Sequence, residues 1–413
     1  MKIAFLVDEF PCLSQTFVLN QVQGIAHLGA DVDVLALAKG KLSNEAESEL
    51  NCSGNINVIY LTKNFKKNRL IKRSLFLLKP FFSKPILLLK SLKSIFGNYG
   101  IQGKSLLLSE IIVSLNSKAD YDVIICHFAH NGFLAEKLRR LKILEGKIIT
   151  FFHGYDVSSK AYQLQNQKNY RSLFQNGDVF LPISNLWHDE LISKGATPQK
   201  VHTHRMGIEL NKFKFSPRTY NPGKKFKLFS VGRLCEKKGH EYLIKAFALL
   251  PNRHQFSIEI AGTGELADKL KSLIIELGLE DEVKLLGATS HNQVIKKLYE
   301  CNLFILPSIT AKNGDMEGIP VALMEAMAIG RLCISTKHSG IPELITENKE
   351  GLLVKEKDIN GLRDSILWAF NNLDQVGEII INARHKVDNI ADIQKLNESL
   401  LNRIVSLITI NKF

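Results

Sequence analysis

The chain has 413 residues, enough for two domains of ordinary size, and its content of 45% hydrophobic and 23% charged residues is typical of a globular protein. No stretch of about twenty uncharged apolar residues occurs, so we expect no transmembrane helix. The formal net charge is +13, and six scattered cysteines without a CxxC pair favour a reducing, cytoplasmic location and argue against a structural metal.

The first predicted elements are a strand at residues 2–7, a helix at 17–28 and a strand at 31–36. The opening apolar run has five residues before Asp8, which is too short for a signal peptide and fits a buried strand. This order begins a doubly wound parallel sheet, in which ligands bind at the carboxyl ends of the strands. We therefore expect the loop containing Ser14, Gln15 and Thr16 to face a site, although an ordinary connection would look the same.

Residues 63–96 interleave basic residues with large apolar ones. Between positions 51 and 109 there are eleven Lys or Arg residues and no Asp or Glu. Basic amphipathic segments of this kind lie in membrane interfaces and are attracted to anionic lipid, so we expect 63–96 to contact a membrane surface. One alternative is a helical insertion with solvated lysines; a nucleic-acid surface has less support, because no known binding module is recognisable.

Two strands predicted at residues 122–126 and 147–152 lead into histidines. The first ends before His127, and the second is followed by His153, Gly154, Tyr155 and Asp156. A histidine at a strand end that precedes a glycine can turn toward a ligand. His153 could then hydrogen-bond a sugar hydroxyl, with Asp156 orienting it or the acceptor; a histidine with a purely structural role is the alternative.

The N-terminal series ends with a strand at 178–182 and a helix at 186–194, for which Ser184 is a good N-cap. Residues 207–225 are rich in Pro, Asn and Lys and lack periodicity, so we place a domain boundary there. A second α/β series follows. We expect its strands at 227–231, 256–261, 283–286, 303–306, 332–335 and 351–354, and its helices at 242–250, 292–299, 359–372 and over much of 376–413.

Two loops of this second series carry features suited to a nucleotide. Arg233 and Lys238 follow the strand at 227–231, and two cations at a strand end can neutralise a diphosphate and the charge it develops as a leaving group. Gly262 and Gly264 follow the strand at 256–261 and fit a tight turn beside a nucleotide, although a bare GTG is a weak signal.

Residues 314–327, GDMEGIPVALMEAM, follow the strand at 303–306 and read as a loop and a helix start with Pro320 in the first turn. The N–H groups of Gly318, Ile319 and Val321 would then offer a site for a phosphate. Glu317 and Glu325, with seven residues between them, could take sugar and ribose hydroxyls. The alternative is a solvated Glu325 and a Glu317 favoured only by the helix dipole.

Taken together, these motifs resemble the retaining glycosyltransferases of the two-Rossmann (GT-B) type, family 4. The opening FLVDEFPCLSQTFVLNQV resembles the subgroup that builds bacterial exopolysaccharide and colanic acid repeat units. The resemblance covers nearly the whole chain, is strong over 226–355 and is weakest over 40–120. The residues that carry it are Gly232-Arg233-Leu234, Lys238-Gly239, Gly262-Thr263-Gly264, Glu317 with Glu325, and His153-Gly154-Tyr155-Asp156.

The resemblance implies a role for each motif. Arg233 and Lys238 would bind the donor diphosphate, with the amides of Gly318 and Ile319 on the phosphate. Glu317 would contact the transferred sugar and Glu325 the ribose. His153 would lie near the reacting sugar, and Asp156 near the acceptor or its support. Ser14-Gln15-Thr16 stands where many members have two glycines, so acceptor contacts from that loop are open. The family needs no metal, and no cofactor is implied.

The predicted fold is therefore α/β of the GT-B type, with two Rossmann-like doubly wound domains facing each other across a cleft. We expect an acceptor-binding domain at 1–207, a nucleotide-sugar-binding domain at 225–390, and a helix at 391–413 that could cross back to the first domain. The predicted protein is a retaining hexosyltransferase on the inner face of the plasma membrane, acting from a nucleoside-diphosphate sugar on a lipid-linked saccharide.

Three alternatives belong to other classes. A two-Rossmann sugar-nucleotide epimerase shares the architecture but would not be expected to have the glutamate pair. A non-catalytic sugar-nucleotide-binding protein would keep the fold and lose the two cations. A nucleic-acid-binding protein would explain the charge alone and would show strongly salt-dependent binding; we expect no nucleic-acid partner.

Overall fold

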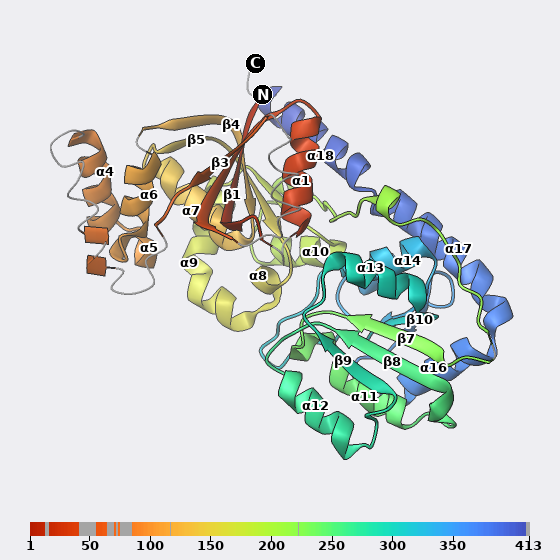
Figure 1. Ribbon diagram of the computed structural model, residues 1–413. Helices are drawn as coiled ribbons and strands as arrows, with labels where there is room; N and C mark the ends of the chain where they lie inside the picture. The colour runs from red at the N-terminus through yellow and green to blue at the C-terminus, as the bar shows by residue number, and fades with distance from the viewer. Residues whose placement is uncertain are drawn as a thin grey trace.

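The computed structural model describes residues 1–12, 16–40, 55–63, 70–71, 73–74, 85–115, 117–221 and 223–409. Within these residues the chain forms two parallel six-stranded sheets flanked by helices (Figure 1). The strand order is β3-β2-β1-β4-β5-β6 in the first sheet and β12-β11-β10-β7-β8-β9 in the second. The predicted fold, two doubly wound Rossmann-like domains, is confirmed.

The first sheet and its helices come from the N-terminal half of the chain. Its strands are β1 (Lys2–Phe10), β2 (Asp31–Lys39), β3 (Ile56–Tyr60), β4 (Ala119–His127), β5 (Leu144–Phe152) and β6 (Val179–Pro182). Its helices are α1 (Thr16–His27), α4 (Pro85–Phe96), α5 (Gly100–Lys104), α6 (Leu107–Leu115), α7 (Ala129–Arg140), α8 (Tyr155–Ser158), α9 (Lys160–Asn176) and α10 (Asn185–Ser193), with the 3₁₀ turn η2 (Pro198–Lys200).

The second sheet repeats the pattern. Its strands are β7 (Phe226–Val231), β8 (Phe256–Ala261), β9 (Val283–Gly287), β10 (Leu303–Leu306), β11 (Leu332–Thr336) and β12 (Leu352–Val354). The α-helices are α11 (His240–Ala248), α12 (Ala267–Glu276), α13 (His291–Glu300), α14 (Val321–Ile329), α15 (Ile341–Leu344), α16 (Ile359–Asn371), α17 (Leu373–Ile390) and α18 (Ile393–Thr409). Three further 3₁₀ turns are η3 (Leu210–Lys212), η4 (Glu236–Lys238) and η5 (Arg253–Gln255).

Every strand expected from the sequence is present, because most are apolar runs buried on both faces of a parallel sheet; the edge strand β9 is only partly buried. In β1, Ile3 and Phe5 belong to one core and Ala4 and Leu6 to the core on the opposite face. The short edge strand β3 was not expected, since it is only partly buried and follows no clear pattern.

The C-terminal helices join the two halves of the molecule. Helix α17 packs on α14 of the second half, and α18 packs on α1 of the first, as Figure 1 shows. Leu400 and Ile404 of α18 are fully buried in the core of the first half. Gly24 of α1 permits the close approach, because a Cβ built there would lie 1.9 Å from Nδ2 of Asn397. The helix expected over much of 376–413 is thus two helices, separated near Ala391 and Asp392.

Two smaller expectations had different outcomes. Ser184 is the N-cap of α10, as expected, and its Oγ accepts a hydrogen bond of 3.3 Å from the amide of Trp187. Pro320, expected in the first turn of its helix, is instead the N-cap of α14, with an extended ψ of 124°. Among the residues that the structure describes, no helix has the length and hydrophobicity needed to span a bilayer.

Candidate functional site

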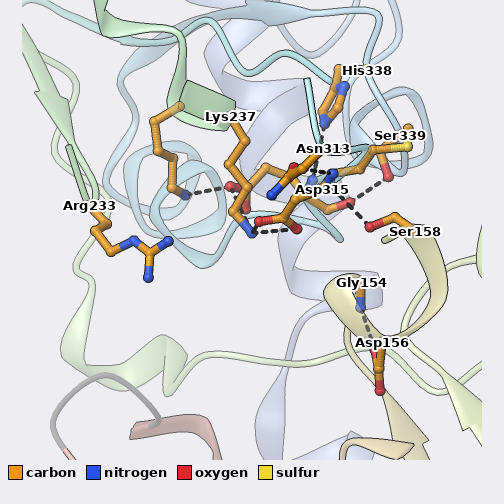
Figure 2. A network of polar contacts seen from close by, with 12 residues as sticks. Gly154, Asp156, Ser158, Arg233, Lys237, Asn313, Asp315, His338 and Ser339 are labelled. Atoms are coloured by element: carbon orange, nitrogen blue, oxygen red, sulfur yellow. Dashed lines mark hydrogen bonds and ion pairs between the residues drawn. The ribbon is translucent and has the colours of Figure 1, made fainter. Parts of the chain in front are cut away.

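A network of charged and polar side chains forms where loops of the two sheets meet (Figure 2). The contributing loops follow the carboxyl ends of β5, β7, β10 and β11, which is where doubly wound sheets bind ligands. The loops after β5 and β10 touch directly, since the amide of Met316 donates to Oγ of Ser158 at 3.1 Å. The network therefore contains residues from both halves of the molecule.

Glu317 is at the centre of a cation–carboxylate cluster in this network. Nζ of Lys238 lies 3.1 Å from Oε1 of Glu317, and Nζ of Lys237 lies 3.9 Å from the same atom. Lys237 also contacts Asp315 at 3.2 Å. Burial by itself would raise the pKa of Glu317, but the two lysines outweigh it and hold that pKa below its ordinary value. Glu317 is thus a buried carboxylate that stays ionised.

The sequence predicted Lys238 and Glu317 as site residues, and the structure brings them into contact. It also adds Lys237 and Asp315, which sequence reasoning missed. Each lies within two positions of a predicted residue, but a sequence does not reveal whether a neighbouring side chain points the same way. Here Lys237 bridges Asp315 and Glu317, as Figure 2 shows for Lys237 and Asp315.

Arg233 stands apart from this cluster. Its side chain is 65% exposed, and its guanidinium lies 4.0 Å from Glu265, which is itself exposed. In Figure 2 it lies to one side, with no contact drawn to the other residues. The two predicted cations therefore have different surroundings: Lys238 contacts the buried Glu317, and the Arg233 side chain is largely exposed.

Gly262 and Gly264 pack against the backbone that carries Arg233. A Cβ on Gly262 would lie 2.0 Å from the carbonyl oxygen of Gly232, and a Cβ on Gly264 would lie 2.3 Å from that of Leu234. The amide of Leu234 donates to the carbonyl of Thr263 at 2.9 Å. The sequence assigned these glycines to the nucleotide; in the structure they let two neighbouring loops approach each other closely.

The loop before α14 presents backbone amides at the site. Gly318 and Ile319 are buried, and within the described chain their N–H groups, like that of Val321, donate no hydrogen bond. Gly318 is in close contact with the other half of the molecule, since a Cβ there would lie 2.2 Å from Cδ1 of Ile183 and 3.0 Å from the carbonyl of His153. Unpaired N–H groups at a helix start favour an anionic ligand.

Glu325 has different partners from Glu317. It is a buried residue of α14, and its Oε1 lies 2.9 Å from Nε2 of His291 at the start of α13. The hydrogen bond to this carboxylate raises the pKa of His291. Sequence reasoning missed His291, which lies 34 positions away and matches no motif.

His153 and Asp156 occupy the end of β5 and the start of α8. Nε2 of His153 lies 3.0 Å from Nδ1 of His127. Asp156 accepts hydrogen bonds from the amides of Ala129, His153 and Gly154 at 3.0, 3.0 and 3.1 Å. Asp156 therefore fixes the backbone of the loop that presents His153. Burial lowers the pKa of His153 to about 3, so its ring is neutral at neutral pH and can donate or accept one hydrogen bond.

The predicted acceptor-side residues are only partly described. Ser14 and Gln15 lie outside the described residues, and Thr16 is an exposed first residue of α1. In the first half of the molecule the structure also has a pair that the sequence did not single out, in which Nε2 of His130 lies 2.5 Å from Oδ2 of Asp8. A possible signal was the position of Asp8 near the carboxyl end of β1.

Glu343 joins the two halves at a second point. Its Oε1 accepts hydrogen bonds from the amides of Asn185 and Leu186, at 2.7 and 3.2 Å, at the start of α10. Its Oε2 lies 2.7 Å from Nη2 of Arg205. A carboxylate of the second half thus caps a helix of the first, where the helix dipole favours negative charge.

Three histidines at and near this junction are neutral at neutral pH; His204 and His240 are buried, and His153 is partly exposed. Burial lowers the pKa of His153 and His240 to about 3 and that of His204 to about 4. In the unfolded chain each would have a pKa of about 6.5, so the unfolded state takes up protons first as the pH falls. The stabilisation from neutral histidines is complete above about pH 6.5 and decreases from there toward pH 4.

We therefore expect acid to destabilise the protein well before its carboxylates titrate. From pH 7.5 to 5.5 each of these histidines should cost about 1 kcal/mol of unfolding free energy. His130 and His291, whose pKa values are raised, offset part of the loss. Thermal unfolding at the two pH values measures the effect. His204→Gln should reduce the difference in melting temperature between them. A melting temperature unchanged over this range would contradict the expectation.

Comparisons with known proteins agree with this geometry. A family model described as glycosyl transferases group 1 matches residues 211–386. The chain is 39% identical over 394 residues to the amylovoran biosynthesis glycosyltransferase AmsK of Erwinia amylovora, covering 94% of this chain and 95% of that protein. It is 37% identical over 413 residues to the Escherichia coli (strain K12) protein WcaL, named for colanic acid biosynthesis, covering 98% and 100%.

A solved structure has the same architecture. The crystal structure of Anabaena HepE in complex with UDP-glucose matches with a TM-score of 0.71, covering 98% of this chain and 100% of that one. The sequence identity is 18%, so the match concerns the fold. Because the match covers both halves of this chain, HepE shares its overall fold.

Proposed function

This chain belongs to the glycosyl transferases of group 1, and from that premise we propose that it transfers a hexose from a nucleoside-diphosphate sugar to a lipid-linked saccharide in exopolysaccharide biosynthesis. The observation that carries the proposal is the buried, ionised Glu317 held by Lys237 and Lys238 beside unpaired loop amides. The two relatives, AmsK and WcaL, are named for amylovoran and colanic acid biosynthesis.

The donor would bind at the loops of the second sheet. Lys238 and the exposed Arg233 would hold the diphosphate, together with the amides of Gly318 and Ile319. Glu317 would face the transferred sugar, and Glu325 with its partner His291 would take the ribose hydroxyls. The crystal structure of HepE contains UDP-glucose, which is a donor of this chemical class.

The transfer would break the bond from the anomeric carbon to the phosphate oxygen and form a bond from that carbon to the oxygen of an acceptor hydroxyl, whose proton passes to the departing diphosphate. The cations and amides stabilise the negative charge that develops on the departing diphosphate, which is electrostatic catalysis. The carboxylate of Glu317 stabilises positive charge that develops on the sugar. We propose retention of the anomeric configuration from the family resemblance, and a reaction that needs no metal because lysine and amide groups serve the diphosphate.

The acceptor would come from the side of the first sheet, where α4 and α5 form an outlying lobe (Figure 1). One face of α4 buries Leu87, Ser91 and Ser94. The opposite face of α4 exposes apolar side chains around Lys93, and α5 exposes one further large apolar side chain. Their exposed fractions are 67% for Ile86, 65% for Leu89, 83% for Phe96 and 82% for Ile101.

We propose that this lobe rests on an anionic membrane surface, at the inner face of the plasma membrane, where a lipid-linked acceptor lies. Exposed apolar residues interleaved with lysines suit the headgroup boundary. Residues 64–69, 72 and 75–84 of the basic segment lie outside the described residues, so the support comes from its end, residues 85–96, and from α5.

Vesicle binding tests the membrane proposal. Phe96→Ser combined with Ile101→Ser should weaken binding to vesicles containing phosphatidylglycerol about tenfold or more, since two large apolar side chains no longer enter the interface. Leu164→Ser combined with Ile275→Ser, also exposed apolar residues but on α9 and α12, is the matched control and should change nothing. Equal binding by both double variants would refute the proposed contact surface.

A donor panel tests the transfer itself. Purified protein is incubated with UDP-, GDP- and ADP-sugars, and release of the nucleoside diphosphate is followed with and without an extract of lipid-linked acceptors. Acceptor-dependent release of the nucleoside diphosphate from one of these sugars would support the proposal and identify the donor. A folded protein that neither binds nor turns over any donor would instead be a non-catalytic member of the family.

A further inference from the structure

His338 is a buried histidine that no motif predicted and that contacts Glu317 through the backbone. It lies in the loop after β11 and is labelled in Figure 2. Its side chain is fully buried. Nε2 of His338 lies 3.1 Å from the amide nitrogen of Glu317, and Nδ1 lies 2.6 Å from Oε1 of Glu356.

The hydrogen-bond partners determine which ring nitrogen carries the proton. A backbone amide can only donate, so Nε2 of His338 must accept from Glu317 with its lone pair. The proton of the neutral ring is therefore on Nδ1, which donates to the carboxylate of Glu356. Glu356 selects the tautomer that the amide of Glu317 requires.

Glu356 is itself held in place. It accepts hydrogen bonds from the amide of Thr310 at 2.8 Å and from its hydroxyl at 3.1 Å. Thr310 follows β10, His338 follows β11 and Glu356 follows β12, and these three strands are neighbours in the second sheet. The chain of hydrogen bonds thus connects the Glu317 loop to the ends of three adjacent strands.

Ser339, the residue after His338, contacts the carbonyl group of Glu317. Oγ of Ser339 donates to the carbonyl oxygen of Glu317 at 2.5 Å. Ser339 has a φ of 48°, a left-handed conformation that a serine adopts at some cost. Two consecutive residues therefore hold both the N–H and the C=O of Glu317, and one of them is strained in doing so.

We propose that His338 is a positioning residue for the transfer, which orients Glu317 through its backbone amide and is itself oriented by Glu356. This inference rests on the proposed function, in which Glu317 faces the transferred sugar. His338 touches no substrate in this account. Its effect arises because a displaced carboxylate loses its alignment with the reacting sugar, while Arg233 and Lys238 still hold the diphosphate.

Two substitutions separate the two hydrogen bonds of His338. The amide group of glutamine reaches the position of Nε2, so His338→Gln keeps an acceptor for the amide of Glu317 and loses the donor to Glu356. The amide group of asparagine reaches the position of Nδ1, so His338→Asn keeps the donor to Glu356 and leaves the Glu317 amide without its partner. Both remove the ring, and asparagine, one methylene shorter, leaves the larger void, so the melting temperature of each variant is measured beside its activity.

The expected result is a split between the two variants. His338→Asn should lower kcat about 10²-fold, the scale of a misplacement of about 1 Å, with nucleoside-diphosphate affinity within about threefold of wild type. His338→Gln should retain most of kcat. A purely structural histidine would instead give losses of activity that follow the melting temperature in both variants, and that outcome, or a fully active His338→Asn, would overturn the proposal.

Amide hydrogen exchange supplies a readout that is independent of activity. Protection of the Glu317 amide should be lost in His338→Asn and kept in His338→Gln. Unchanged protection in His338→Asn would overturn the positioning contact. An inactive wild-type protein would refute the proposed function, and the exchange measurement would still decide whether His338 holds the loop.

Discussion

Replacing Glu317 by glutamine should lower kcat by about 10²-fold or more, the range typical for loss of one preorganised electrostatic group. The substitution keeps the shape of the side chain and removes its charge. In the wild type that charge is buried and ionised, because Lys237 and Lys238 hold its pKa below the ordinary value. A neutral amide cannot stabilise positive charge that develops on the sugar.

Donor release with and without acceptor measures the effect, and nucleoside-diphosphate binding shows that the variant is folded. Glu300→Gln is the matched control. Glu300 is the last residue of α13, outside the site loops; it is partly exposed and forms an ion pair with Lys297. We expect that control to keep full activity. Glu317→Gln with near wild-type kcat would remove Glu317 from the reaction and with it the main support for the donor site.

Gly262→Ala should destabilise the second half of the protein by about 3 kcal/mol or more, the combined scale of overpacking and of strain at a positive φ. A Cβ there would lie 2.0 Å from the carbonyl oxygen of Gly232, and φ is 140°. The neighbour is backbone, so no side chain can rotate out of the way. The loop that carries Arg233 would have to move, and donor affinity should fall as well.

Thermal unfolding measures this loss, which at about 2–4 °C per kcal/mol should lower the melting temperature by roughly 6–12 °C. Gly278→Ala is the matched control: its φ is 59°, and nothing lies within 4 Å of the added Cβ. Gly278→Ala should lower the free energy of unfolding by about 1 kcal/mol, from the left-handed backbone conformation alone. Equal losses in the two variants would mean that backbone conformation, and not the contact with Gly232, makes Gly262 necessary.

Much of the site was accessible from the sequence because its residues lie in short loops directly after apolar strands. A parallel strand buried on both faces is a local pattern, and its carboxyl end fixes where the next loop begins. Lys238, Glu317, Gly318 and His153 could therefore be named from strand positions and motif spacing. Helices α7, α9 and α12 were not predicted, although α12 is as amphipathic as α11, which was.

Other site residues could only be found in three dimensions. His338 and Glu356 meet Glu317 and Thr310 because β10, β11 and β12 are adjacent, an order that no stretch of sequence states. The cap that Glu343 gives to Asn185 joins residues 158 positions apart. Likewise, the sequence could propose a nucleotide role for Gly262, but the need for glycine arises from the carbonyl of Gly232.

The sequence by itself determined the two-sheet architecture and the loops that carry the site, because burial patterns and turn residues act over a few neighbouring positions. The tertiary structure alone decided which of those side chains are paired, buried or strained. The physical reason is that hydrogen bonds and ion pairs depend on distances of about 3 Å, and packing between distant segments sets those distances. In this chain, packing between distant segments keeps Glu317 ionised and His153 neutral. It also brings His338 into hydrogen-bond contact with the loop that contains Glu317.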